Sequence, residues 1–154
     1  MHGFEIRLML EGDLARVAEV LGHWGMAPVQ PGSEFPALED SGLALGRTLV
    51  AVAQGQVVGC ASYVVTGPHE ASTESLAVDP AWVGKGVGEQ LQRARLQALR
   101  DLGVRHVRTT ADRPSTIAWY VARFGYRVTG TLPKRHVFGL AHVPDWTVLE
   151  LDLD

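Results

Sequence analysis

The sequence predicts an α/β fold whose central sheet is mixed, mostly antiparallel and built of about six to seven strands. Short apolar runs separated by turn residues recur along the chain, which is typical of sheet strands. One run passes through a proline turn into a glycine-rich segment that opens a long amphipathic helix, and another apolar run follows that helix. A strand, a helix and a strand in this order form a parallel pair, so the predicted sheet is not purely antiparallel.

The length and composition of the chain bound its organisation. With 154 residues and 46% hydrophobic content, the chain is long enough for one compact core. Since no linker-like or repeated segment divides it, we expect residues 1–154 to form a single domain.

The N-terminal elements are a predicted strand at residues 4–10 and a predicted helix that Asp13 would cap. Residues 25–40 contain three prolines and scattered apolar groups, which predicts an irregular segment packed on the core. The apolar residues of the helix recur at helical spacing: Leu14, Val17, Ala18, Leu21 and Trp24.

The next part of the chain predicts an antiparallel meander. Residues 48–53 and 57–65 flank the sequence at 54–56, a compact hairpin signal, and residues 74–78 form the fourth strand. Cys60, the only cysteine, lies in the third strand, so an intramolecular disulfide is excluded and a buried, inert thiol is expected.

The second half of the chain begins with a predicted helix at residues 86–102, which Gly103 ends. Residues 104–109 should then return parallel to the fourth strand, and a helix follows at residues 115–123. Two final strands close the sheet, at residues 126–131 and 146–153. The apolar face of the first helix is Val87, Leu91, Ala94, Ala98 and Leu102.

Charge and hydropathy exclude two classes of partner. The net charge is −3 with acids and bases interspersed, which argues against a nucleic-acid-binding face. Residues 105–108 are basic but alternate with valines, as a half-solvated strand does. No apolar run is long enough to cross a bilayer, and Glu5 and Arg7 interrupt the first one, so a cytoplasmic protein without membrane contact is expected.

Three alternating glycines, Gly84, Gly86 and Gly88, precede the long helix. Without Cβ atoms the backbone can turn tightly and present unpaired N–H groups, at the positive end of the helix dipole, to a phosphate. The Walker pattern is excluded because Lys85 is followed by Gly86, and the GxGxG spacing differs from the GxGxxG dinucleotide fingerprint. A diphosphate ligand other than an NTP or NAD is favoured; a glycine-rich helix start without a ligand is the alternative.

The segment LAVDPAWVGKGVGEQL resembles motif A of the GCN5-related N-acetyltransferases, Q/R-x-x-G-x-G/A after a strand ending in V-x-P. Gly86 and Gly88 align with the two signature glycines. Val83 stands at the Gln/Arg position, which removes one side-chain contact, and Lys85 would supply part of the missing charge.

Residues 115–126 resemble motif B of the same family, a helix followed by A-I-x-L-Y-x-x-x-G-F. The spacing from Tyr120 to Gly125 is one residue longer than usual, and Ser115 or Thr116 replaces the usual Asn. The residues that match in kind are Ile117, Trp119, Tyr120, Gly125 and Tyr126.

The resemblance implies the GNAT fold, with a splayed parallel strand pair, about four helices, and acetyl-CoA as cosubstrate without a metal. In the family the glycine loop binds the pyrophosphate, and the pantetheine arm runs along the preceding strand as an added strand. The implied coenzyme A-binding residues are Leu76, Ala77, Val78, Val83, Gly84, Lys85, Gly86, Val87, Gly88, Ser115, Trp119 and Tyr120.

The implied reaction is direct attack of a neutral amine on the thioester carbonyl, with a backbone N–H at a strand bulge supporting the oxyanion. Glu74 is the candidate base because it lies two residues before Leu76; an exposed acid that only attracts a cationic acceptor is the alternative. His69 and Glu70 are weaker candidates, in the preceding loop. The resemblance makes Tyr120 the candidate acid at the sulfur; a core aromatic is the alternative.

The resemblance also implies an acceptor site bordered by the irregular segment and by the connection between the last two strands, near Glu74. For the irregular segment, a loop that only packs on the core is the alternative. Cationic residues there would favour an acceptor with a carboxylate or phosphate. The spacing of His136, His142 and Asp145 matches no compact zinc pattern, so no metal site is expected. The candidate acceptor-site residues are Trp24, Met26, Phe35, Leu38, Glu74, Lys134, Arg135, His136 and His142.

These observations predict an acetyl-CoA-dependent N-acetyltransferase that acts on a small amine, such as an amino acid or a polyamine-like amine, or on a protein amino group. The alternatives are a non-catalytic acyl-CoA-binding sensor and a dimerisation domain without a ligand. A homodimer would pair through the final strand, around residues 146–151.

Overall fold

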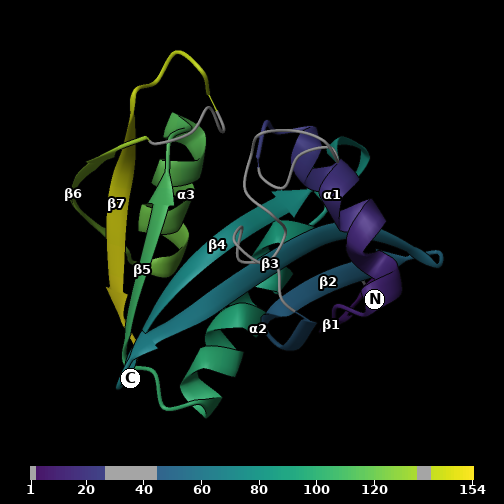
Figure 1. Ribbon diagram of the computed structural model, residues 1–154, viewed down its shortest axis with the longest axis horizontal. Coiled ribbons are helices and arrows are strands. Elements are labelled where there is room, and N and C mark those ends of the chain that lie inside the picture. The colour runs from purple at the N-terminus through teal and green to yellow at the C-terminus, as the bar shows by residue number, and fades with distance from the viewer. Residues whose placement is uncertain (1–2, 27–44, 135–139) are drawn as a thin grey trace.

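The computed structural model describes residues 3–26, 45–134 and 140–154 (Figure 1). Seven strands form one sheet in the order β1-β2-β3-β4-β5-β7-β6. Three α-helices lie in the described parts of the chain: α1 (Leu14–Gly22), α2 (Val87–Asp101) and α3 (Pro114–Phe124). The strands are β1 (Glu5–Leu8), β2 (Thr48–Ala53), β3 (Gln56–Gly67), β4 (Glu70–Val78), β5 (His106–Ala111), β6 (Arg127–Pro133) and β7 (Asp145–Asp152). The predicted α/β fold with a mixed sheet is confirmed.

The sheet is antiparallel except where β4 pairs with β5. That parallel pairing joins only residues 70–72 to residues 106–108, at the beginning of both strands. Figure 1 shows the two strands diverging from this point towards the end of β4. The splayed parallel pair that the family resemblance implied is therefore present.

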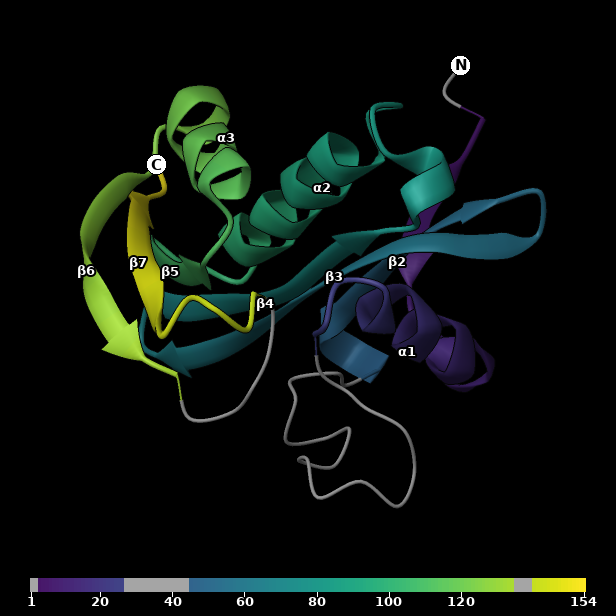
Figure 2. The ribbon, with the colours of Figure 1, turned by 90° about the horizontal axis from the view of Figure 1, so that it is seen from above.

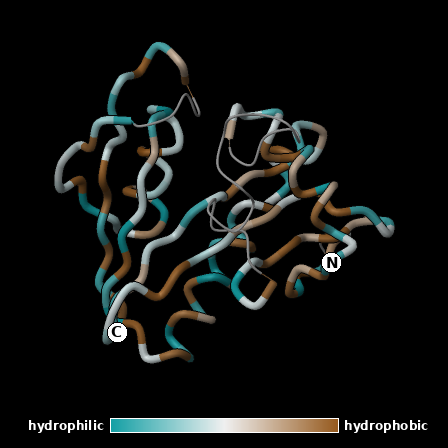
Figure 3. Tube along the Cα trace, in the orientation of Figure 1, coloured by the Kyte–Doolittle hydropathy of each residue, from teal (hydrophilic) through white to brown (hydrophobic). Residues whose placement is uncertain are grey.

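The helices cover the two faces of the sheet. Figure 2 shows α1 on one face and α2 with α3 on the other. The alternation of side chains along the strands divides the core accordingly: Val50 and Cys60 belong to the α1 side, whereas Ala51 and Ala61 belong to the α2 side. Figure 3 shows hydrophobic residues along these strands and a hydrophilic turn between β2 and β3.

Helix α2 lies close to the sheet because β3 carries a glycine beneath it. A Cβ atom on Gly59 would come within 2.9 Å of Leu91 Cδ1 and 3.0 Å of Val87 Cγ1. Any larger residue would force the helix and the strand apart, so Gly59 fixes the height of α2 above the sheet. At its other end the helix stops as predicted, with Gly103 at a φ of +81°.

The structure corrects three details of the sequence reading. Asp13 does not cap α1 with its side chain; its carboxylate instead accepts hydrogen bonds from Arg7, at 2.7 Å, and from the Leu10 N–H, at 2.7 Å. Glu70 is the first residue of β4 and not part of the preceding loop. The final strand is not at the edge, because β7 lies between β5 and β6; the edge strand is β6.

Two other expectations agree with the structure. Cys60 is buried, its Sγ donates to the Ser75 carbonyl oxygen at 3.3 Å, and burial raises the pKa of the thiol to about 12. A thiol with that pKa stays protonated and is a poor nucleophile. Three of the four residues of the basic segment at 105–108 lie in β5, whose residues alternate between buried and accessible. In the parts of the chain that the structure describes, no helix is long and apolar enough to cross a membrane.

Candidate functional site

The glycine loop lies between the end of β4 and the start of α2. Gly84 and Gly86 have φ values of +83° and +86°, a region that residues with a Cβ rarely adopt. Gly86 is the residue before the first turn of α2 and has no side chain to accept the N–H groups of that turn. The positive end of the α2 dipole is therefore open to an anion at this loop.

The residues around these glycines leave the loop accessible. Val83, Gly84 and Lys85 are exposed. The Lys85 ammonium lies 4.8 Å from the centre of the Trp82 ring, which keeps its positive charge next to the loop. Val87 and Gly88 belong to the first turn of α2, where Val87 is buried and packs on the sheet.

The turn that leads into the glycine loop is held by Asp79. Its Oδ1 accepts the Ala81 N–H at 2.9 Å, and its Oδ2 forms an ion pair with Arg16 of α1. These contacts, the Ala81 hydrogen bond first, keep the pKa of Asp79 below its ordinary value. Arg16 also donates to the Val57 carbonyl oxygen at 3.0 Å. The sequence reading missed Arg16, and nothing in the local pattern separates it from an ordinary surface residue of α1.

Among the described residues, the end of β4 has no strand partner on the side of β5. The Asp79 N–H donates to Val58 O at 2.8 Å, which makes Gly59 and Val78 a non-hydrogen-bonded pair. The Val78 carbonyl therefore faces away from β3, towards the side from which β5 has diverged. There it accepts the Trp24 Nε1 proton at 2.8 Å.

The three residues of β4 that were predicted to bind coenzyme A lie in different environments. Ala77 is buried and pairs with Cys60 of β3. Leu76 packs both on the α2 side of the sheet and on the cluster around Tyr120. Val78 is bonded by Trp24, a residue that the sequence placed at the acceptor site.

A β-bulge interrupts β4 beside Leu76. Ser62 pairs with Glu74, whereas Cys60 pairs with Ala77, so two residues of β4 stand opposite one residue of β3. Ser75 in the bulge has a φ of +56°, which is rare for a residue other than glycine. The bulge re-aims the backbone between Glu74 and Leu76, where the sequence predicted the reacting groups.

Glu74 is solvent-accessible, but the protein around it partly removes its carboxyl from water. This desolvation raises the pKa of Glu74, while the charges of Arg47 and Arg95 act in the opposite direction. The carboxylate forms no hydrogen bond or ion pair with any residue in the described ranges. A raised pKa and a free carboxylate are both compatible with a general base.

Tyr120 points into the core beneath the splayed strands. It is only 3% exposed and belongs to a cluster with Tyr126, Ala111 and Leu149, against which Leu76 packs. Its hydroxyl accepts a hydrogen bond from Arg95 Nη2 at 3.2 Å. Tyr120 is therefore next to the predicted coenzyme A strand, and the two readings of it, proton donor and core aromatic, are both compatible with this position.

The other predicted residues of α3 have different exposures. Ser115 lies exposed in the first turn of the helix. Trp119 is partly buried, and its ring makes edge contacts with Tyr120, at 5.1 Å between ring centres, and with Phe124, at 4.9 Å.

The acceptor side is described only in part. Phe35, Leu38, Arg135 and His136 lie outside the described residues. The Lys134 side chain is only 7% exposed, and its ammonium donates to the Asp112 carboxylate at 2.7 Å and to the Leu140 carbonyl oxygen at 2.8 Å. Lys134 therefore joins Asp112, which follows β5, to Leu140, which lies before β7. His142 is exposed.

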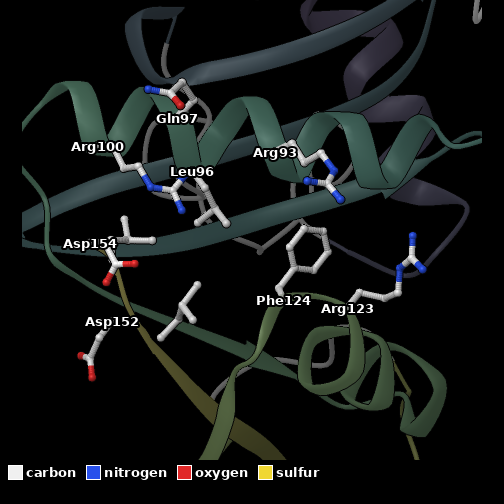
Figure 4. Close-up of a pocket in the computed structure, with 10 residues that line it drawn as sticks. Arg93, Leu96, Gln97, Arg100, Arg123, Phe124, Asp152 and Asp154 are labelled. Carbon is white, nitrogen blue, oxygen red and sulfur yellow. The ribbon is translucent and has the colours of Figure 1, made fainter.

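A hollow of about 430 Å³ lies between α2, the end of α3 and the end of β7 (Figure 4). Arg93 and Arg100 line it on α2, Phe124 lines it on α3, and Asp152 and Asp154 line it at the C-terminus. Figure 4 shows polar side chains around its rim, and none of the predicted site residues takes part. Among the described residues, no group of three or more His, Cys, Asp and Glu side chains is placed to hold a metal ion.

The sequence reading also missed two buried polar residues on the sheet-facing side of α2, Gln92 and Arg95. Arg95 lies one turn after Leu91 and one turn before Leu99, in the middle of the apolar stripe. This position could have indicated a special role for Arg95, because charged residues are rarely buried unless they have specific partners.

Comparison with known proteins agrees with this geometry. The acetyltransferase (GNAT) family model matches residues 17–126, which is more than half of the chain. No curated protein sequence matches the chain.

Solved structures with low sequence identity share the fold. Ard1 from Thermoplasma volcanium is 20% identical with a TM-score of 0.79, and the match covers 99% of each chain. The ribosomal-protein-S18-alanine N-acetyltransferase from Escherichia coli is 18% identical with a TM-score of 0.78, over 98% of this chain and 94% of that one. N-acetylglutamate synthase from Neisseria gonorrhoeae, complexed with coenzyme A and N-acetyl-glutamate, is 18% identical with a TM-score of 0.73, over 98% of this chain but 35% of that one. By the match to its family model, the chain belongs to the acetyltransferase (GNAT) family and is an N-acetyltransferase.

Proposed function

We propose that this protein binds acetyl-CoA along β4 and at the glycine loop, and transfers the acetyl group to a primary amine. One observation carries the proposal: the parallel pair β4 and β5 separates after residue 72, and the end of β4 that is freed in this way leads into the helix start with Gly84 and Gly86 at positive φ. The freed end of β4 could therefore bind an extended arm, and the helix start that follows it could bind a diphosphate.

The diphosphate would lie over the start of α2. The N–H groups of the segment from Gly84 to Gly88 would donate to its oxygens, and Lys85 would add a positive charge. Val83 would contribute only its backbone. The pantetheine arm would use the edge of β4 that faces away from β3, where the Val78 N–H points and where the Val78 carbonyl oxygen already accepts the Trp24 Nε1 proton.

Binding of this kind places the thioester near the bulge in β4. The extra residue of a bulge is left without a strand partner, so a backbone N–H there would be available to the oxyanion. Glu74, on one side of the bulge, would accept the proton that the attacking amine loses. Tyr120, which packs against Leu76, would give a proton to the departing sulfur.

The acceptor class is supported by two kinds of relative. The Escherichia coli structure is named for acetylation of a ribosomal-protein alanine, and the Neisseria gonorrhoeae structure contains N-acetyl-glutamate. We propose a primary amine of either a protein N-terminus or an amino acid, with Trp24, Phe35, Arg135 and His136 at the acceptor site.

The test is coenzyme A release measured with a thiol reagent, using acetyl-CoA and a panel of amino acids, polyamines and N-terminal peptides. We expect release above the rate of thioester hydrolysis with one class of amine. Tight binding of acetyl-CoA without any amine-dependent release would contradict catalysis and would favour an acyl-CoA-binding sensor.

A further inference from the structure

A buried arginine on α2 joins the bulge of β4 to Tyr120. Arg95 is 0% exposed, and its guanidinium lies between the sheet and α3. All five of its N–H donors are used. Its acceptors are Gln92 Oε1, which Nε reaches at 3.0 Å and Nη2 also contacts, Ser62 O at 3.2 Å, Glu74 O at 3.1 Å and the Tyr120 hydroxyl at 3.2 Å.

Every one of these acceptors is uncharged. Arg95 takes part in none of the ion pairs between described residues. Transfer of a charged group from water to a protein interior is unfavourable by several kcal/mol unless the surroundings compensate. A leucine would suit the apolar stripe between Leu91 and Leu99 better, so packing of α2 does not explain an arginine here.

The contacts of Arg95 coincide with the reacting groups of the proposed site. One Nη1 hydrogen bond reaches the carbonyl of Glu74, the residue that opens the bulge, and Ser62 Oγ donates to the same carbonyl at 3.1 Å. The Nη2 hydrogen bond goes to the oxygen of Tyr120, so the proton of that hydroxyl must point elsewhere. Gln92 completes the arrangement by donating to the Tyr126 hydroxyl at 2.9 Å.

We propose that Arg95 is a buried positioning residue of the transfer reaction, which fixes the bulge and the Tyr120 hydroxyl and stabilises Tyr120 after it has donated its proton. The inference rests on the proposed function. A fixed positive charge next to a group that becomes negative lowers the energy of the transition state without reorganisation during the reaction.

The proton and electron balance is simple. The amine lone pair forms the C–N bond, and the C–S bond breaks with its electron pair going to sulfur. Tyr120 gives its proton to the sulfur, and the proton lost by the amine goes to Glu74. Tyr120 remains as a phenolate, hydrogen-bonded by Arg95, until a proton returns from Glu74 through solvent.

The experiment is a double-mutant cycle between Arg95→Met and Tyr120→Phe, measured as kcat and KM for acetyl-CoA in the thiol-release assay. Each single change should lower kcat by about tenfold or more and alter KM by less than about twofold. The loss in the double variant should be clearly smaller than the product of the two single losses, because the part of the Arg95 effect that acts through the Tyr120 hydroxyl is already absent in Tyr120→Phe. Arg95→Lys, which keeps a charge, should recover part of the loss.

Arg100→Met is the matched control, because Arg100 is exposed on the same helix and should tolerate the change. An unfolding titration would show whether Arg95→Met folds. If it does not, the kcat of Arg95→Lys is compared with that of wild type to test the role of Arg95. Wild-type turnover in Arg95→Met, or losses that simply multiply in the double variant, would overturn the role of Arg95. A wild-type protein that releases no coenzyme A with any amine would instead refute the proposed function, and the inference with it.

Discussion

The indole Nε1 of Trp24 donates to the carbonyl oxygen of Val78 at 2.8 Å and so joins the end of α1 to the free edge of β4. The Arg113 guanidinium, at the start of α3, lies 5.1 Å from the centre of the same indole. Trp24 is therefore hydrogen-bonded to β4, one of the two splayed strands, and contacts Arg113 in the segment that follows β5, the other splayed strand. It links the two halves of the sheet where strand pairing has ended.

Trp24→Phe should reduce the free energy of unfolding by about 1 kcal/mol, since it removes the hydrogen bond to Val78 and keeps most of the ring. Urea titrations with an unchanged m value would measure it. Trp24→Ala, which also removes the ring from the core, should destabilise the protein further, by about 3 kcal/mol. Equal stability of wild type and Trp24→Phe would show that this hydrogen bond is not significant.

For the glycine loop we predict changes in stability of opposite sign when Gly86 and Gly88 are replaced by alanine. Gly86→Ala should destabilise the protein by about 1 kcal/mol, because an alanine at a φ of +86° is strained. Gly88→Ala should stabilise it by about 0.5–1 kcal/mol, because Gly88 is helical and a Cβ there would lie at an ordinary 3.6 Å from Val78 Cγ2. Thermal unfolding of both variants would check the signs; the same sign for both would contradict the loop geometry.

His106 predicts a pH dependence of stability. Its ring lies 2.9 Å from Asp152 and 2.6 Å from Glu150, and the hydrogen bond to Asp152 is the main cause that raises the pKa of His106. The same contacts lower the pKa of Asp152, while a hydrogen bond from Thr129, followed by that from His106, lowers the pKa of Glu150. The stabilisation by His106 is therefore complete below its ordinary pKa of 6.5 and is lost as the pH rises through the raised value.

His106→Gln should consequently lower the free energy of unfolding clearly at about pH 5.5 and much less at about pH 8.5. Asp152 and Glu150 set the lower limit of the pH range in which this contact stabilises the protein. Their contribution is lost as the pH falls from the ordinary pKa of each carboxyl group towards its lowered pKa. Urea titrations at the two pH values give the comparison. A loss of the same size at both would mean that His106 acts through packing and not through its charge.

Glu74→Gln should lower kcat by about a hundredfold if the carboxylate accepts the amine proton. Because desolvation raises the pKa of Glu74, wild-type kcat/KM should fall on the acidic side at a pH above the ordinary value of 4.5 for a glutamate. Glu70→Gln is the matched control at the other end of β4, where Glu70 pairs with His106. If Glu74→Gln retains wild-type kcat, another group or a water molecule is the base.

Much of the fold could be predicted because the signals are local. The apolar spacing of α2, the glycines at its start and Gly103 at its end all act within a few residues, and the structure has each of them in place. The order of the last strands could not be predicted in this way. Strand pairing is decided by contacts between distant segments, and β7 enters the sheet between β5 and β6.

The candidate site shows the same difference between local signals and long-range contacts. The glycine loop was recognisable from sequence, whereas the Arg16 ion pair with Asp79 joins residues 63 positions apart. Arg95 was missed for another reason, because charged residues on a helix are usually assigned to its solvated face. The capping role of Asp13 was wrong since its carboxylate is used by Arg7 and the Leu10 N–H.

The central claim, a coenzyme A diphosphate at the start of α2, is tested most directly by calorimetric titration of acetyl-CoA into wild type, Gly88→Ala and Gly88→Glu. Gly88 is the suitable position because its backbone, unlike that of Gly86, accepts a side chain without strain. We predict saturable binding in the micromolar range for wild type and Gly88→Ala, and binding at least about tenfold weaker for Gly88→Glu, whose carboxylate would meet the diphosphate. Binding that is absent in wild type, or equally tight in all three proteins, would contradict the assignment.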